Sequence, residues 1–383
     1  MKRLAVMLLA LGALLFTSVA PARPLKIGFA DPVFTSSNDA TRELWLERSR
    51  KAGAKIARID VSWRGVAGDV VEPANPTDPA SYDWREIPDA VAEANANGLK
   101  VLLTISRAPT WAEGPDRPAD VHGGTWKPDA DKLGDFARAL AAQFAGDVRH
   151  YQAWNEPNIW PFLNPQYEGR RLVSPDIYRR MLNSFYEGIH AVQPNAKVVS
   201  GGTAPFGDPP GGERTRPLRF LRELLCLKNR RKLRPTKCPK KAKLDVLAHH
   251  PINLLGGPNR SASHPDSAAT PDVKNVVRTL RKAEKRHRLK PRGRRPVWVT
   301  EFWWETNPPD TCNGVRPRKH ARWISKALKS FKKQGASVAI NFLIRDAPYR
   351  ASECGGSNFQ TGAYFESGKR KPALRSFRRF ARR

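Results

Sequence analysis

Short apolar runs alternate with helix-like segments along the chain. Eight of these runs have the length and composition of strands buried on both faces, as in a parallel sheet. They cover residues 25–30, 55–61, 99–106, 148–154, 196–200, 244–249, 296–300 and 336–343. Helical segments follow them over residues 40–52, 84–97, 129–144, 175–192, 216–227, 271–287, 319–334 and 372–381. This alternation predicts an α/β fold, a single (β/α)8 TIM barrel.

The irregular residues follow the strands. Long segments rich in proline and glycine cover residues 65–81, 109–127, 201–214, 251–270 and 307–316. In such a barrel these are βα loops, which form the face that carries binding and catalytic sites. We find no linker that divides the chain, so we expect one barrel domain over residues 23–383 with long βα loops.

The N-terminal residues have the pattern of a signal peptide. Lys2 and Arg3 precede an apolar run over residues 5–16, which is too short to span a membrane, and Ala20-Pro21-Ala22 offers small residues for cleavage. We therefore expect residues 1–22 to be removed and the mature chain to begin at Arg23. The expected location is outside the cell, with the protein either free or held at the cell wall by its charge. No later stretch is apolar enough to suggest a membrane span.

The chain has four cysteines, at Cys226, Cys238, Cys312 and Cys354. An even number in an exported chain predicts two disulfides rather than free or partly paired thiols. Three pairings are open, and we favour Cys226 with Cys238, closing one basic loop, and Cys312 with Cys354, joining the loops after the last two strands. No CxxC motif or zinc-like spacing of histidine and cysteine occurs, so we expect no metal and no cofactor.

Basic residues are in large excess, with 67 lysines and arginines against 36 acidic residues and a net charge of +31. This excess has two interpretations. One is a polyanionic partner, such as a uronic-acid polysaccharide, an anionic cell wall or a nucleic acid. The other, which we prefer, is a set of solvated helix faces and loops. Since no nucleic-acid-binding motif accompanies the charge, we expect no nucleic-acid partner. We expect the protein to be a monomer.

Two glutamates stand at the ends of predicted buried strands. Glu156 follows the fourth strand and Glu301 follows the seventh, and aromatic residues surround both in the sequence. Burying a carboxylate is costly unless it has a partner or a function. The ends of these two strands face each other across a barrel, so the two side chains are expected to converge. Paired carboxyl groups of this kind cleave glycosidic bonds. The alternative is that each glutamate pairs with an arginine.

Several tryptophans lie in or beside the predicted loops. They are Trp63, Trp111, Trp126, Trp160, Trp303 and Trp304. Because barrel interiors favour branched aliphatic residues, loop tryptophans are suited to line a cleft and stack on sugar rings. The alternative is packing against the barrel rim. We expect about half of them to contact sugar and single out Trp160 and Trp303, with Trp111 as a further candidate.

The segment Trp154-Asn155-Glu156-Pro157-Asn158, together with Thr300-Glu301-Phe302, resembles clan A of the glycoside hydrolases, in particular family 39 and the cellulase-like family 5. The resemblance covers essentially the whole mature chain. It implies a retaining hydrolase in which Glu156 is the acid/base and Glu301 the nucleophile. It further implies that Asn155 binds the sugar 2-hydroxyl and that Arg58 on the second strand supports the nucleophile carboxylate.

Three positions depart from the clan pattern. His250-Pro251-Ile252 stands where the clan often has His-x-Tyr, so the tyrosine hydroxyl is missing. The eighth strand ends in Asn341-Phe342-Leu343 rather than tryptophan, which makes Phe342 a weaker sugar platform. Ser106-Arg107 replaces a histidine common in family 5. Adjacent strand residues point to opposite faces, so we expect His250 to line the substrate pocket and His249 to pack outward.

These observations predict a secreted retaining glycoside hydrolase that acts without a cofactor. The substrate is open among glucan, xylan, mannan, a β-xyloside and a uronic-acid polymer, and the charge slightly favours an anionic glycan. A rival hypothesis is a non-catalytic carbohydrate- or wall-binding barrel, which fits the missing tyrosine and the basic surface. A third is a transglycosylase, which would use the same residues with a different acceptor.

Overall fold

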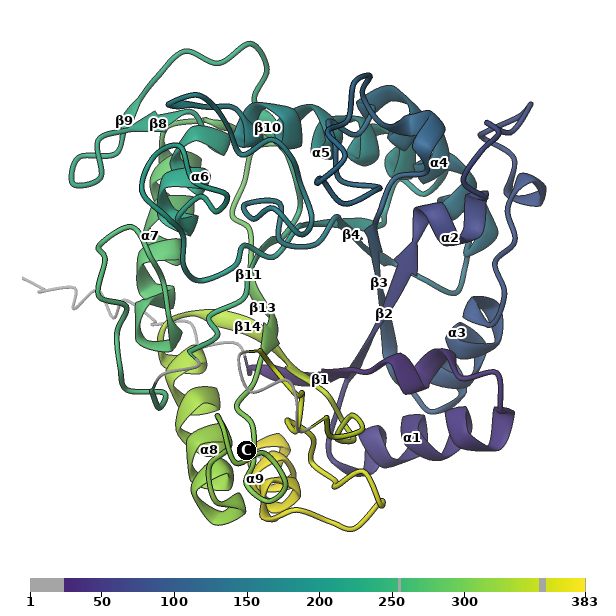
Figure 1. The fold of residues 1–383 in the computed structure, drawn as a ribbon, viewed down its shortest axis with the longest axis vertical. Helices are drawn as coiled ribbons and strands as arrows, with labels where there is room; N and C mark the ends of the chain where they lie inside the picture. The colour runs from purple at the N-terminus through teal and green to yellow at the C-terminus, as the bar shows by residue number, and fades with distance from the viewer. Residues whose placement is uncertain (1–23, 254–255, 351–355, 383) are drawn as a thin grey trace, which may run out of the picture.

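The computed structural model describes residues 24–253, 256–350 and 356–382, and it confirms the predicted barrel. Within these residues, eight parallel strands pair in the order β11-β13-β14-β1-β2-β3-β4-β7. Their bounds are β1 (Lys26–Ala30), β2 (Ile56–Ser62), β3 (Lys100–Ser106), β4 (His150–Ala153), β7 (Lys197–Ser200), β11 (Leu247–His249), β13 (Val297–Phe302) and β14 (Ala336–Phe342). Bridges from Val199 to Val246 and from Thr203 to His249 close the ring between β7 and β11 (Figure 1).

Helices surround the ring and pack on its outer face (Figure 1). They are α1 (Asp39–Lys51), α2 (Trp63–Ala67), α3 (Ile87–Ala96), α4 (Ala130–Gln143), α5 (Ser174–Val192), α6 (Pro217–Leu224), α7 (Val273–Lys285), α8 (Pro317–Lys333) and α9 (Pro372–Ala381). Most barrel strands are thus largely apolar toward the helices and toward the interior. This two-sided burial explains why the strands read as continuous apolar runs instead of alternating ones.

Two apolar cores result from this arrangement. The larger lies between the sheet and the helices and contains fully buried aromatic side chains such as Phe136, Phe185 and Phe331. The smaller fills the barrel interior, with Ile56, Leu102 and other side chains from successive strands. Barrel interiors are filled in this way by layers of mostly branched residues, so the barrel is solid below its catalytic face.

Three pairs of short strands decorate the barrel. β5 (Tyr167–Glu168) and β6 (Arg171–Leu172) form a hairpin after β4, and β8 (Leu227–Lys228) pairs with β9 (Arg234–Pro235). β10 (Ala242–Lys243) pairs with β12 (Leu289–Lys290) below the barrel strands that follow them in sequence. Together with the loops, the first hairpin adds structure to the face at the carboxyl ends of the strands.

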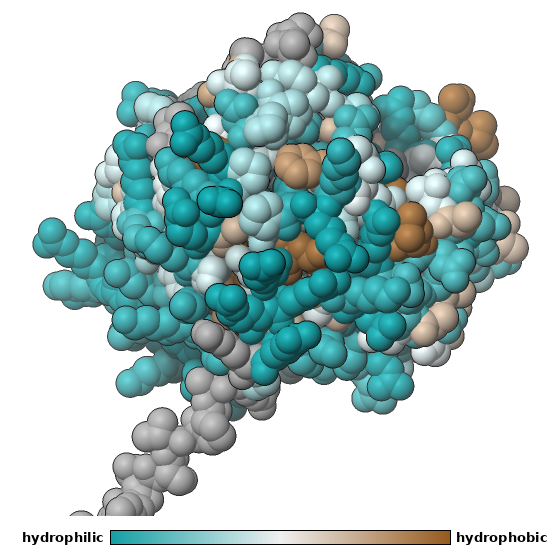
Figure 2. Space-filling model, turned by 90° about the horizontal axis from the view of Figure 1, so that it is seen from below, coloured by the Kyte–Doolittle hydropathy of each residue, from teal (hydrophilic) through white to brown (hydrophobic). Residues whose placement is uncertain are grey.

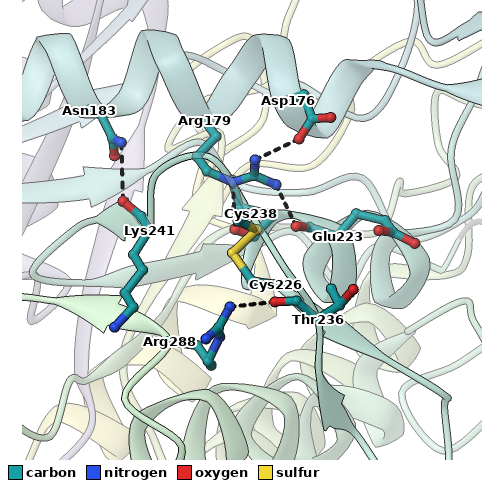
Figure 3. The surroundings of a disulfide bond; sticks show 10 residues. Asp176, Arg179, Asn183, Glu223, Cys226, Thr236, Cys238, Lys241 and Arg288 are labelled. Carbon is teal, nitrogen blue, oxygen red and sulfur yellow. Dashed lines mark hydrogen bonds and ion pairs between the residues drawn. A yellow bond between two sulfur atoms is a disulfide. The ribbon is translucent and has the colours of Figure 1, made fainter.

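The expected disulfide between Cys226 and Cys238 is present and closes the basic segment that contains β8 and β9, with the two Cα atoms 5.8 Å apart. Figure 3 shows that Arg179 of α5 holds this segment from one side, donating to Asp176 and to the backbone oxygen of Glu223. Cys312 is disulfide-bonded as well. Its expected partner, Cys354, and the predicted signal peptide over residues 1–22 lie outside the described residues.

The surface is strongly hydrophilic. Figure 2 shows one face covered largely by polar and charged side chains, with only small, separate apolar areas. The large apolar residues exposed within the described chain are Leu44, Val70, Val71 and Val192. In the part of the chain that the structure describes, no helix has the length and apolar character needed to cross a membrane.

Candidate active site

The two glutamates converge at the carboxyl ends of the barrel strands. Glu156 lies just after β4, Glu301 lies on β13, and the ring of His250, directly after β11, stands between them. The Nδ1 atom of His250 is 2.9 Å from Oε1 of Glu156 and 3.9 Å from Oε2 of Glu301. The convergence expected from the barrel geometry is therefore present, and both carboxylates share one partner atom.

Two donors hold the Glu301 carboxylate. Arg58 of β2 donates from NH1 to Oε2 at 3.1 Å, and the indole nitrogen of Trp303 donates to Oε1 at 3.1 Å. Arg58 is 3% exposed, so its charge acts at short range and with little screening by water. The Arg58 contact is the one that the sequence resemblance implied. Arg58 and Trp303 thus hold the two oxygens of the Glu301 carboxylate in fixed positions.

Glu156 stands in a different environment. Its side chain is 12% exposed, and the ionisable side chain that it contacts is a histidine, not an arginine or a lysine. Burial raises the pKa of Glu156 to about 7, and the positive charge of Arg58 offsets only part of this effect. Trp154 and Glu156 both adopt positive φ, at 74° and 33°, a backbone region that costs energy for residues other than glycine. The chain bends sharply here, at the segment that carries the Glu156 carboxyl.

Asn155 lies between these two bent residues. Its Oδ1 atom accepts a hydrogen bond from NH2 of Arg58 at 3.0 Å, and the residue is 7% exposed. This contact fixes the amide so that its NH2 group, which has no partner within the described residues, points away from Arg58. Arg58 therefore positions both Asn155 and Glu301 with one planar guanidinium group.

A directed chain of hydrogen bonds fixes the tautomer of His250. Arg58 Nε donates to Thr104 at 3.1 Å, Thr104 donates to Oε1 of Gln152 at 3.0 Å, and Gln152 Nε2 donates to Thr300 Oγ1 at 3.2 Å. The Thr300 hydroxyl is then left to donate to His250 Nε2, 3.0 Å away. Burial lowers the pKa of His250 to about 4, so the ring is neutral at pH 7 and carries its single proton on Nδ1. That proton faces Oε1 of Glu156.

The hydrogen-bond chain makes a testable prediction for Thr300→Val. Without the hydroxyl, His250 is free to place its proton on Nε2 and to present a lone pair to Glu156. An acceptor beside Glu156 favours its protonated form, so we expect the pKa of Glu156 to rise by up to about one unit. The pH–activity profile should shift to higher pH by that amount, while thermal unfolding reports any change in fold. Thr300→Ser is the matched control, and an unshifted profile in Thr300→Val would contradict the assigned tautomer.

His249 and His250 point to opposite sides, as expected. The His249 ring contacts the Thr203 hydroxyl at 2.9 Å and the backbone oxygen of Ala268 at 2.9 Å, away from the carboxylates. His250 is fully buried, so it lies behind the two glutamates and contacts them instead of forming an exposed wall of the pocket. Within the described residues, no group of three or more His, Cys, Asp or Glu side chains is placed to hold a metal ion.

Three aromatic side chains adjoin the carboxylates. Trp303 is held by its bond to Glu301, and its ring packs edge-on against Phe359 at 5.7 Å between centroids. Phe359 in turn packs edge-on against Phe342 at 5.2 Å. Phe359 was missed by the sequence analysis, because it lies in an irregular segment and adopts a positive φ of 54° that nothing in the sequence signals.

A buried lysine holds the segment that carries Phe359. The Nζ atom of Lys371 donates to Asp346 at 2.5 Å, to the Thr306 hydroxyl at 2.7 Å and to the backbone oxygen of Gln360 at 2.9 Å. These acceptors come from the loop after β13, the loop after β14 and the segment next to Phe359. Lys371 is 2% exposed, so one ammonium group ties together the three parts of this wall.

The other tryptophans divide between cleft and core. Trp160 is half-buried and stacks on His122 with centroids 5.0 Å apart, and Trp126 is also partly exposed. Trp63 and Trp304 are buried in the core, so the cleft prediction is wrong for them. Trp111 packs edge-on against Trp63 at 5.6 Å and so follows the alternative of packing against the rim. Within the described residues, the Trp111 ring contacts Trp63 and the ammonium group of Lys132 rather than the carboxylates.

Solved structures share this fold. A family 39 glycoside hydrolase from Bacteroides cellulosilyticus superposes with a TM-score of 0.61 at 17% identity, over 94% of this chain and 64% of that one. A family 5 subfamily 18 protein from Streptomyces cattleya, in complex with GlcNAc, gives 0.59 at 15% identity, over 94% and 80%. A broad-specificity endoglucanase of family 5 from Clostridium longisporum gives 0.57 at 14% identity, over 94% and 96%.

The resemblance to clan A is thus confirmed in the fold, and these low identities support the fold alone. This chain spans less than two thirds of the length of the family 39 structure. No family model matches the sequence, and no curated protein matches it either.

Proposed function

We propose that this protein is a glycoside hydrolase that cleaves its substrate with retention of configuration. The observation that carries the proposal is the unequal treatment of two converging carboxyl groups. Glu301 receives a cationic and an indole donor, whereas burial raises the pKa of Glu156 to about 7. Two titratable groups whose environments differ in this way are suited to separate roles as nucleophile and acid/base.

The separation of the carboxyl groups supports retention. His250 Nδ1 is 2.9 Å from one oxygen of Glu156 and 3.9 Å from one oxygen of Glu301. The distance between these two oxygens therefore cannot exceed the sum of the two values. This upper limit lies near the lower end of the carboxyl separations of inverting enzymes, roughly 6.5–9.5 Å. The ~5 Å separation of retaining enzymes lies well within it.

In the proposed reaction, Glu301 attacks the anomeric carbon while Glu156 gives its proton to the oxygen of the leaving sugar. The carbon–oxygen bond breaks and a glycosyl ester with Glu301 forms. Glu156, now ionised, takes a proton from water, whose oxygen attacks the anomeric carbon and releases Glu301. Because Oε1 of Glu156 accepts from His250, the other oxygen is the one free to carry the transferred proton.

The structures that share this fold include an exo-β-1,4-mannosidase, a family 5 subfamily 18 protein in complex with Manb1-4GlcNAc and a broad-specificity endoglucanase. We propose a β-linked glycan as the substrate class for this chain. The test is to incubate the protein with neutral and acidic polysaccharides and with aryl β-glycosides, and to follow the product anomer by NMR. A first-formed β-anomer supports the proposal, and a first-formed α-anomer from a β-glycoside rejects retention. Binding without any product would favour the carbohydrate-binding alternative, and products longer than the substrate would favour a transglycosylase.

Activity should depend on the protonation of Glu156. The acid must hold its proton for the first step, so we expect kcat/KM to fall as pH rises through about 7, the pKa to which burial raises Glu156. An aryl glycoside whose phenolate leaves readily needs little proton assistance, and it should lose less activity above this pH. If Glu156→Gln, assayed with such a substrate, showed the same fall of kcat/KM above this pH, the titrating group would be a residue other than Glu156.

We further propose that the protein is exported as a monomer after removal of residues 1–22. The charged and apolar pattern of those residues and the even number of cysteines support this proposal. Mass spectrometry of the protein recovered from the medium should give a mature N-terminus at Arg23, and sedimentation should give the mass of one chain. Retention of the full-length chain inside the producing cells would reject export.

A further inference from the structure

A hollow of 460 Å³ lies beside the candidate active site, on the same catalytic face. Its lining comes from the β5–β6 hairpin after β4, the loop after β7, the start of α6 and the loop after β11. Arg170, Arg216, Arg219 and His264 supply its basic groups. The loops after β4 and β11 are the ones that carry Glu156 and His250, so the hollow and the candidate site share their supports.

The acidic residues of the hollow are already neutralised. Asp208 accepts from Arg214 at 2.6 Å, and Asp266 accepts two bonds from Arg222 at 2.7 and 2.9 Å. Arginine–carboxylate forks of this kind satisfy both partners. The hydrogen-bond partners of these carboxylates, Arg214 and Arg222, are thus arginines other than those that line the hollow.

Two arginines of the hollow have no acidic partner within the described residues. Arg170 forms no ion pair there, and neither does Arg216. The Nε atom of Arg216 is buried without any hydrogen-bond partner in the described residues. Because protein atoms cover Nε, a ligand in the hollow would contact the terminal nitrogens of this guanidinium group. The planar fork of an arginine suits a carboxylate or sulfate group.

His264 adds a donor to the same hollow. Its Nδ1 atom accepts from the backbone N–H of Asp266 at 3.0 Å. A neutral ring must then carry its proton on Nε2, which is left as a donor. Arginine and histidine donors without a competing free carboxylate make a site for an oxyanion.

The hollow is tied firmly to the acid/base candidate. Thr215, the residue before Arg216, donates from its backbone to the oxygen of Asn158 at 2.7 Å, and Asn158 donates back to Thr215 at 2.8 Å. Both residues are fully buried. Three Cα steps of ~3.8 Å and one strand-like pair of about 5.5 Å limit the Cα separation of Arg216 and Glu156 to roughly 17 Å. A short oligosaccharide can reach across such a distance.

We propose that this hollow binds an anionic group, a carboxylate or a sulfate ester, on a sugar unit removed from the bond that is cleaved. The inference rests on the proposed function and specifies it, since it makes the substrate an acidic glycan. The net charge of +31 fits the same partner, which the sequence alone left open against solvated helix faces.

The test measures binding without turnover, in the full mature chain carrying Glu301→Gln. Calorimetry compares a short β-1,4-linked oligoglucuronate with its methyl ester and a sulfated cello-oligosaccharide with its unsulfated form. Arg216→Gln is added in one variant and Arg375→Gln in a matched control. Arg375 is an exposed arginine of α9, which lies well apart from α6 in Figure 1. The first pair tests for recognition of a carboxylate, and the second tests for recognition of a sulfate ester.

We expect Arg216→Gln to weaken binding of the acidic oligosaccharide on the order of 10-fold or more, with the neutral partner unchanged and Arg375→Gln near the parent. Arg216→Lys keeps the charge but not the fork and should fall between them, and thermal unfolding checks that each variant is folded. Failure of every acidic probe to bind, or equal losses in both glutamine variants, overturns the inference. Hydrolysis confined to neutral glycans and unaffected by Arg216→Gln would overturn it too, while leaving the proposed function intact.

Discussion

Glu301→Gln should reduce kcat on the order of 10⁴-fold or more, the largest effect of any substitution considered. The amide has nearly the shape of the carboxylate but cannot form the glycosyl ester, so the two-step reaction stops before it begins. Glutamine keeps one of the two oxygens, so only one of the hydrogen bonds from Arg58 and Trp303 loses its acceptor. Initial rates on the best substrate of the panel, measured with purified variants, give the ratio.

The control for this prediction is Glu187→Gln. Glu187 is an exposed glutamate on α5 that pairs with Lys243, so the same atom replacement occurs away from the site. Its rate should stay within about 2-fold of the wild type, since exposed ion pairs contribute little. Comparable rates in Glu301→Gln and in the wild type would remove Glu301 from the proposed mechanism.

Arg58→Met should have the second largest effect, and it should act on both activity and stability. Arg58 is buried and bonds Glu301, Asn155 and Thr104 at 3.0–3.1 Å. Its removal leaves a buried carboxylate without its cation, which costs about 3–5 kcal/mol of folding free energy in comparable cases. We expect kcat to fall by roughly 10²–10³-fold, because the hydrogen bonds that position the nucleophile and Asn155 are lost together.

Arg58→Lys separates charge from geometry. The ammonium group retains the positive charge but cannot make the planar set of bonds to Glu301 and Asn155. It should therefore recover much of the stability and little of the rate. Chemical denaturation and steady-state kinetics report the two effects independently. A lysine variant with full activity would show that charge alone is what Glu301 needs.

Much of the fold follows from local sequence. Strands buried on both faces are largely apolar, and that constraint is visible in most of the eight runs. The convergence of Glu156 and Glu301 followed from the barrel, because strand ends on one rim approach each other whatever their separation in sequence. The Cys226–Cys238 pairing was favoured because it closes a short loop, which the structure confirms.

Side chains set by tertiary packing were not predictable in this way. Trp63 and Trp304 follow strands just as Trp303 does, yet they turn into the core, since the direction of a loop side chain depends on neighbours far away in sequence. Phe359 reaches the site through a left-handed backbone and a lysine clamp assembled from three separate segments. The neutral state of His250 likewise depends on a relay through four strands, which no single stretch of sequence encodes.

The Lys371 clamp also sets an order of assembly. The wall that carries Phe359 follows the eighth strand in the chain, so every barrel strand has been synthesised before this wall and its lysine are made. The residues that form the ring are therefore complete in the chain before those that complete the site. A chain that ended at residue 343 would contain all eight barrel strands but would lack Phe359 and Lys371.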